Sequence, residues 1–205
     1  MNTRFGADKA RAAGMSTSVG GIGPLLRERI VAQADAGVDV IGVTLMYESV
    51  WVQTWHEWGQ ITLQRESVGR EIRTVCEPTN LGFKLNLYDG KTADVEVWKT
   101  KYGTADVYFL SCPGITDVVY PGPKDMPAGT AGANAFAWSH DIRLKHSWIV
   151  GRGALVLSKK LGRKPDISIL SETPTIFTHN RLFKDELQND PFFAETRYIF
   201  NDHTP

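Results

Sequence analysis

Residues 38–47 (VDVIGVTLMY) form an almost unbroken apolar run, and this run constrains the fold more than any other segment. It is too short for a helix on its own, but it suits a β-strand covered on both faces, as in a parallel sheet. The preceding residues 24–36 have the apolar spacing of a helix, with Pro24 at its first position and Gly37 where a C-terminal cap belongs. A buried strand that follows an amphipathic helix is typical of α/β proteins.

The middle of the chain has a different, alternating pattern. Residues 81–88 and 93–102 alternate apolar with polar side chains, and Asp89-Gly90 between them is a favoured hairpin turn. A further short strand is predicted over residues 107–110. We therefore expect an antiparallel β insertion over about residues 50–112, with one face in water.

The last third of the chain returns to alternating helix and strand. Asn134 is a candidate N-cap for a long helix that ends at Leu161-Gly162. Short apolar strands are expected over residues 167–170 and 198–200, with a further helix over residues 174–188 between them. Strand–helix units at both ends of the chain, with an antiparallel insertion between them, predict the α/β class.

Composition excludes several classes of function. Lys and Arg total 23, as do Asp and Glu, so a nucleic acid or an anionic membrane held by bulk electrostatics is disfavoured. No apolar run reaches the ~18–20 residues of a spanning helix. Residues 1–18 lack the apolar region of a signal peptide and predict a loose segment, followed by one domain over residues 19–205. Two cysteines, Cys76 and Cys112, suggest neither a disulfide framework nor a metal cluster and favour reduced thiols in a cytoplasmic protein.

A glycine-rich segment opens the first predicted helix. Gly20, Gly21 and Gly23 would let the backbone approach an anion, and the free N–H groups at a helix start favour a phosphate. The segment has no P-loop lysine and does not match the dinucleotide fingerprint. A plain tight turn is therefore equally compatible with it.

Two polar segments follow predicted strands, where ligands bind in open α/β sheets. Glu172 lies in the first of them, which is also compatible with an ordinary helix N-cap. His203 lies in the second, where an imidazole can hydrogen bond a sugar hydroxyl or transfer a proton, or occupy an exposed loop. Four basic residues lie at the end of the long predicted helix: Lys159, Lys160, Arg163 and Lys164. We interpret them as a solvated helix end rather than as a phosphate site.

The order of several short segments along the chain is distinctive. They are VGGIG (19–23), VDVIGVTLMY (38–47), PGITDVVYPG (113–122), RLKHSWIVGRGALVLSKKLGRKPDISILSE (143–172) and FNDHTP (200–205). In this order they resemble the amino-terminal half of the α-glucan phosphorylases, the family of glycogen, starch and maltodextrin phosphorylases. That family has a Gly-Gly-Leu-Gly loop before a strand, a threonine-aspartate-x-x-tyrosine segment, a long helix ending in leucine-glycine, and a threonine-histidine-threonine-proline segment.

The resemblance implies the Rossmann-like half of a GT-B glycosyltransferase fold, with the active site between two such domains. The family cleaves α-1,4-glucan with phosphate and releases glucose 1-phosphate, and pyridoxal phosphate acts through its phosphate group as proton donor and acceptor. The implied partners are α-glucan, phosphate and a second domain or chain that carries the cofactor lysine. No nucleic acid or membrane partner is expected, and we expect the chain alone to be inactive in phosphorolysis.

The resemblance also assigns roles to individual residues. His203 would be a catalytic residue that contacts the sugar in the donor subsite. Glu172 would be a second catalytic residue and would line the cleft near His203. Substrate-binding roles fall on Asp117 and Tyr120, which match the segment before the mobile loop at the site entrance. The glycine loop would bind the cofactor through backbone N–H groups near the phosphates. Its residues are Gly20, Gly21 and Gly23.

Two other functions stay open. One is a non-catalytic carbohydrate-binding module whose aromatic side chains stack on sugars, although the tryptophans in question are more typical of a core or an interface: Trp51, Trp55 and Trp58. The other is a structural or interaction subunit, which predicts an exposed apolar patch and self-association. Ser171 stands where the phosphorylases have asparagine, and Thr173-Pro174 stands where they have histidine.

Overall fold

The computed structural model describes residues 22–55, 61–67, 69–119, 121–128, 134–171 and 189–201. The chain divides into two compact units. Unit 1 comprises Met1–Asn80 and Glu96–Tyr120, and unit 2 comprises Leu81–Val95 and Pro121–Pro205. The expected loose segment, residues 1–18, lies outside the described residues.

Unit 1 is built on a mixed β-sheet. Strand β1 (Ile41–Leu45) pairs in parallel with β7 (Ala105–Ser111), and β7 pairs antiparallel with β6 (Thr92–Tyr102). The short β4 (Glu77–Pro78) pairs antiparallel with β6, so the order is β1-β7-β6-β4. The strand predicted over residues 38–47 is therefore confirmed over Ile41–Leu45, but only Gly42 and Leu45 in it are buried, so the expected burial on both faces is only partial.

Strand β7 corrects one expectation. It was predicted as part of an antiparallel insertion with one wet face, but it is also the parallel partner of β1. Six of its seven residues are buried, whereas β6 alternates between exposed and buried side chains along most of its length. A strand covered on both faces belongs to the centre of a sheet, so the antiparallel segment is continuous with the parallel pair rather than separate from it.

Helix α2 (Ile22–Asp35) precedes β1, as predicted, but it begins two residues before Pro24. Proline is tolerated in a first helical turn because its missing N–H needs no partner there. The chain then reverses through Gly37, whose φ of 85° favours glycine. Gly42 allows the close approach of α2 to β1, since a Cβ there would lie 3.1 Å from Cδ1 of Ile30.

The core of unit 1 forms where α2, the sheet and helix α3 (Gly69–Val75) meet. It comprises Met46, Ile72, Cys76, Tyr102, Val107 and Phe109. Cys76 and Cys112 are both buried, and burial raises the pKa of the Cys76 thiol to about 11. A thiol with such a pKa stays protonated at neutral pH, so Cys76 is a packing residue and a poor nucleophile.

A two-stranded antiparallel sheet completes unit 1. Its strands are β2 (Ser49–Trp55) and β3 (Ile61–Ser67), and β2 contains Trp51 and Trp55. Trp58 lies outside the described residues. Helix α3 follows β3 and was not predicted, because its seven residues, GREIRTV, give too little periodicity to identify a helix.

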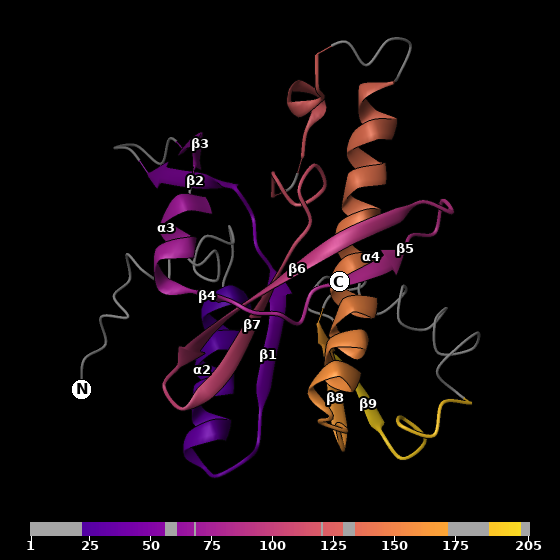
Figure 1. The fold of residues 1–205 in the computed structure, drawn as a ribbon. Helices are drawn as coiled ribbons and strands as arrows, with labels where there is room; N and C mark the ends of the chain where they lie inside the picture. Colours follow the sequence, from indigo (N-terminus) through magenta and orange to yellow (C-terminus); the bar gives the residue numbers. More distant parts are fainter. Residues whose placement is uncertain are drawn as a thin grey trace. The chain divides into compact units, whose positions relative to one another are not determined.

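Unit 2 contains a long helix and a β-hairpin arm. Helix α4 (Ala135–Leu161) begins at Asn134, whose side chain accepts hydrogen bonds from the backbone N–H groups of Phe136 and Ala137. It ends at Gly162, which has a left-handed φ of 65°. Strand β5 (Phe83–Asn86) contacts α4 and pairs with the first residues of β6 through the predicted Asp89-Gly90 turn (Figure 1).

A parallel pair of strands completes unit 2. Strand β8 (Ile167–Ser171) pairs with β9 (Arg197–Asn201), and a short 3-10 turn, η2 (Pro123–Asp125), contacts α4. Both strands were predicted, whereas the helix expected over residues 174–188 lies outside the described residues. Within the part of the chain that the structure describes, every helix is too short or too polar to cross a membrane.

A pair of valine substitutions tests the packing of unit 1. Val107 is 1% exposed in β7, whereas Val38 is 53% exposed before β1. Val107→Ala removes two buried methyl groups, so we expect it to lower the free energy of unfolding by about 2 kcal/mol. The matched change Val38→Ala should cost less than about 0.5 kcal/mol. Urea unfolding measures both, and equal losses would contradict the buried position of β7.

Candidate functional site

Two edges of the structure carry the carboxyl ends of parallel strands, which is where open α/β sheets bind ligands. In unit 1 the edge is formed by β1 and β7, and their pairing is extended by a hydrogen bond of 2.9 Å from the Met46 N–H to the Leu110 carbonyl. In unit 2 it is formed by β8 and β9. Each edge has its own set of side chains.

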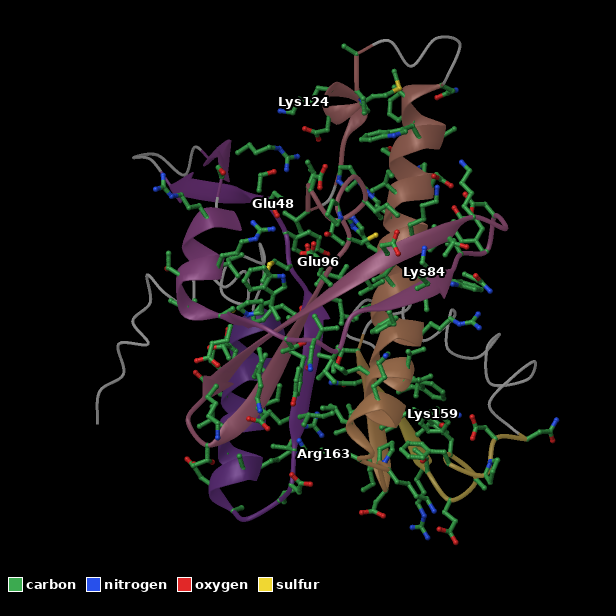
Figure 2. The ribbon with its side chains drawn as sticks, in the orientation of Figure 1. Glu48, Lys84, Glu96, Lys124, Lys159 and Arg163 are labelled. Atoms are coloured by element: carbon green, nitrogen blue, oxygen red, sulfur yellow. The ribbon has the colours of Figure 1, made fainter. Side chains whose placement is uncertain are left out.

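An ion pair dominates the unit 1 edge. Arg73 Nη1 donates to Glu48 Oε2 at 2.8 Å, and Nη2 donates to Oε1, so the contact is bidentate. The guanidinium also lies 5.5 Å from the ring centre of Trp98. A Cβ at Gly69 would overlap the Glu48 carboxylate, so a larger residue at the start of α3 would require the Glu48 side chain to shift. Figure 2 labels Glu48 together with Glu96, whose carboxylate accepts from the Trp98 indole at 3.3 Å.

The ion pair fixes the charge of Glu48. The hydrogen bond from Arg73 holds the pKa of Glu48 below its ordinary value of 4.5, and burial opposes this shift without reversing it. The same hydrogen bond raises the pKa of Arg73. Glu48 is therefore an anion at neutral pH and a poor general acid, so this part of the edge suits binding and orientation rather than proton transfer.

Asp117 belongs to the turn that follows β7. Its Oδ1 accepts a hydrogen bond of 2.9 Å from the Gly114 N–H, and its carbonyl accepts from the N–H and the hydroxyl of Ser49 at 2.9 and 3.1 Å. Asp117 is exposed, and its carbonyl connects the turn after β7 to the first residue of β2. Its binding of substrate stays a prediction, and Tyr120 lies outside the described residues.

The start of α2 contains one residue of the predicted glycine loop. Gly23 lies in the first helical turn, where N–H groups lack partners inside the helix, and this turn contains no acidic residue. These features are compatible with a phosphate group. Gly20 and Gly21 lie outside the described residues, so the glycine loop as a whole stays a prediction.

The unit 2 edge brings two predicted segments together. In the register of β8 and β9, Ser171 is the direct partner of Asn201. Glu172 follows the first of these residues immediately, and His203 comes two residues after the second. Both lie outside the described residues, so their catalytic roles stay predictions, but the strands that lead into them end side by side.

Two of the four basic residues at the end of α4 form ion pairs. Lys159 Nζ lies 2.5 Å from the Asp190 carboxylate, and Lys164 Nζ lies 2.5 Å from the Glu195 carboxylate. Figure 2 labels Lys159 near this end of the helix. The contacts favour the interpretation as a solvated, paired helix end over a phosphate site. Among the described residues, no group of His, Cys, Asp and Glu side chains has the arrangement of a metal site.

One charged cluster in unit 2 was not predicted. Lys145 is 8% exposed, and its Nζ lies 2.7 Å from Asp141 and 3.1 Å from Asp89. Burial lowers the pKa of Lys145, but the two carboxylates outweigh it and the net shift is upward. The four-residue spacing of Asp141 and Lys145 was visible in the sequence, whereas the contact with the hairpin turn was not.

The chain is similar to the catalytic domain of starch synthase IV from Arabidopsis thaliana, solved with ADP and acarbose. The TM-score is 0.59 at 16% sequence identity, over 91% of this chain and 31% of that one. The chain has an α/β, glycosyltransferase-like fold. It spans about a third of the starch synthase structure. No family model and no curated protein matches the sequence.

The Glu48–Arg73 ion pair predicts a pH-dependent stability. Because folding lowers the pKa of Glu48, its stabilisation is complete above the ordinary value of 4.5 and is lost as the pH falls through the folded-state value. Both side chains are about one-third exposed, so solvent screening limits the effect of Glu48→Gln to about 0.5–1 kcal/mol near neutral pH.

Urea unfolding at about pH 7 and about pH 3 measures this difference. We expect Glu48→Gln to be less stable than the unmodified chain at the higher pH, with the gap closing at the lower one. Glu28→Gln changes an exposed glutamate of α2 and serves as the control with no gap at either pH. A constant gap for Glu48→Gln would show that the loss comes from packing rather than from charge.

Proposed function

We propose that this chain is the amino-terminal, Rossmann-like part of an α-glucan phosphorylase, a glycosyltransferase that releases glucose 1-phosphate from α-1,4-glucan and phosphate. The observation that carries the proposal is the pairing of Ser171 with Asn201 at the carboxyl ends of β8 and β9. This register brings together the strands that lead into Glu172 and His203, the two residues to which the family resemblance assigns catalytic roles. The glycosyltransferase-like fold supports the class of reaction.

Each residue of the proposed site has chemistry suited to its role. The His203 imidazole can donate a hydrogen bond to a sugar hydroxyl, and a histidine side chain can transfer a proton. Glu172 lines the donor subsite as a hydrogen-bond acceptor. Asp117 and Tyr120 border the entrance, where Asp117 is already held by the Gly114 N–H.

The cofactor of this proposal is pyridoxal phosphate. The first turn of α2, with Gly23 and no acidic residue, fits its phosphate group through backbone N–H donors. When bound, the cofactor supplies a phosphate that acts as proton donor and acceptor to the substrate phosphate. Gly20 and Gly21 complete the glycine loop in this proposal. The lysine that holds the cofactor comes from a second domain or a second chain, and the protein is cytoplasmic in this proposal.

The chain by itself should be inactive. A closed cleft excludes water and surrounds the developing charge with fixed dipoles, and one domain supplies only one wall of such a cleft. We expect no glucose 1-phosphate from maltoheptaose and phosphate with the purified 205-residue chain. A coupled assay for glucose 1-phosphate measures this, and robust turnover would refute the need for a second domain.

The assembled protein provides the positive test. Native mass spectrometry with an absorbance scan of protein purified from its source should find a larger polypeptide or a partner chain with a pyridoxal chromophore. In that assembly, His203→Ala should lower kcat/KM at least about 100-fold, because it removes a hydrogen-bond donor to the reacting sugar. His140→Ala changes an exposed histidine of α4 and should leave kcat/KM unchanged. Equal activity of the two variants would exclude His203 from catalysis.

A further inference from the structure

Two aromatic side chains of unit 2 form an exposed pair. Tyr88 lies in the turn between β5 and β6 and is 40% exposed, and Trp148 lies on α4 and is partly exposed. Their ring centres are 5.8 Å apart, with the ring planes at 67°. This edge-to-face arrangement leaves apolar ring surface at the protein–water boundary.

Both rings are held in place by hydrogen bonds at their polar ends. The Tyr88 hydroxyl donates to the Asp141 carboxylate, and the Trp148 indole N–H donates to the Asn86 carbonyl at 2.8 Å. Lys145 holds Asp141, the acceptor of the Tyr88 hydroxyl, in place. Its Nζ forms ion pairs with both Asp141 and the turn residue Asp89. The polar ends are therefore satisfied within the protein, and the rings need little further ordering to bind a ligand.

The charges around the pair balance one another, because Asp89 and Asp141 are paired with Lys91 and Lys145. Asn86 and Thr92 are exposed and hydrogen bonded to each other at 3.3 Å, and Lys91 beside them is exposed near Asp89. A rigid aromatic surface bordered by amide, hydroxyl and ammonium groups complements a sugar ring, which has an apolar C–H face and a perimeter of hydroxyl groups. Two rings are too small a surface for a stable protein interface, which needs about 800 Å² on each partner.

We propose that Tyr88 and Trp148, with the polar side chains around them, form a binding site for an α-glucan chain on unit 2. The identification of the sugar as α-glucan rests on the proposed function. The aromatic rings supply stacking surface, and Asn86 and Lys91 hydrogen bond hydroxyl groups at the sugar perimeter. Such a site would hold a long glucan on the protein between reaction cycles and raise its local concentration.

Calorimetric titration of the 205-residue chain with maltoheptaose tests this site. We expect saturable binding, weakened about tenfold or more by Tyr88→Ala and by Trp148→Ala. Tyr88→Phe keeps the ring and should bind within about twofold of the unmodified chain. Phe136→Ala removes an aromatic ring on the same helix that is 67% exposed, and it should not change the affinity.

Circular dichroism melts show whether each variant folds. If Tyr88→Ala does not fold, Tyr88→Leu is measured in its place. Three results would each overturn the site: no saturable heat up to about 10 mM maltoheptaose, the same loss for Tyr88→Phe as for Tyr88→Ala, or the same loss for Phe136→Ala.

The outcome separates this site from the proposed function. Binding that depends on Tyr88, in an assembled protein without phosphorolysis, supports the glucan site and refutes the phosphorylase assignment. Phosphorolysis that depends on His203, without saturable binding by the isolated chain, refutes the glucan site and leaves the phosphorylase assignment in place.

Discussion

The parallel pairing of β1 with β7 is the constraint on which unit 1 depends. It aligns Leu45 with Leu110, so both strands end at one edge of the sheet. The pairing requires β7 to be buried on both faces and α2 to approach β1 closely, which Gly42 allows. Everything at this edge follows from it: the turn held by Asp117, the return of the chain through Ser49, and the position of Glu48 opposite α3.

Capping and turn residues predicted those elements whose ends depend on residues adjacent in the sequence. Helix α4 begins and ends where Asn134 and Gly162 indicated, because capping depends on a few adjacent backbone groups. The hairpin turn at Asp89-Gly90 was predictable for the same reason. Strand β7 was misplaced because its second neighbour, β1, lies about 60 residues away in sequence, and alternation within β7 does not reveal that pairing.

In the candidate site, too, the features that depend on adjacent residues were predictable, and those that depend on tertiary contacts were not. That Glu172 and His203 follow strands was visible in the sequence, and the pairing of Ser171 with Asn201 confirms that those strands are neighbours. The ion pair of Glu48 with Arg73 and the contacts of Lys145 were not predictable, because each joins segments that only tertiary folding brings together. Charged side chains are common on surfaces, so a sequence alone does not indicate which of them will meet.

The two carboxyl edges differ in the chemistry that they can perform. At the unit 1 edge, the Glu48 carboxylate is neutralised by Arg73, and the lowered pKa of Glu48 removes it as a proton donor near neutral pH. The β8–β9 edge leads instead into the segment that contains His203, and a histidine side chain can both donate and accept a proton. The Glu48–Arg73 pair is therefore suited to orienting polar groups through fixed charge rather than to moving a proton.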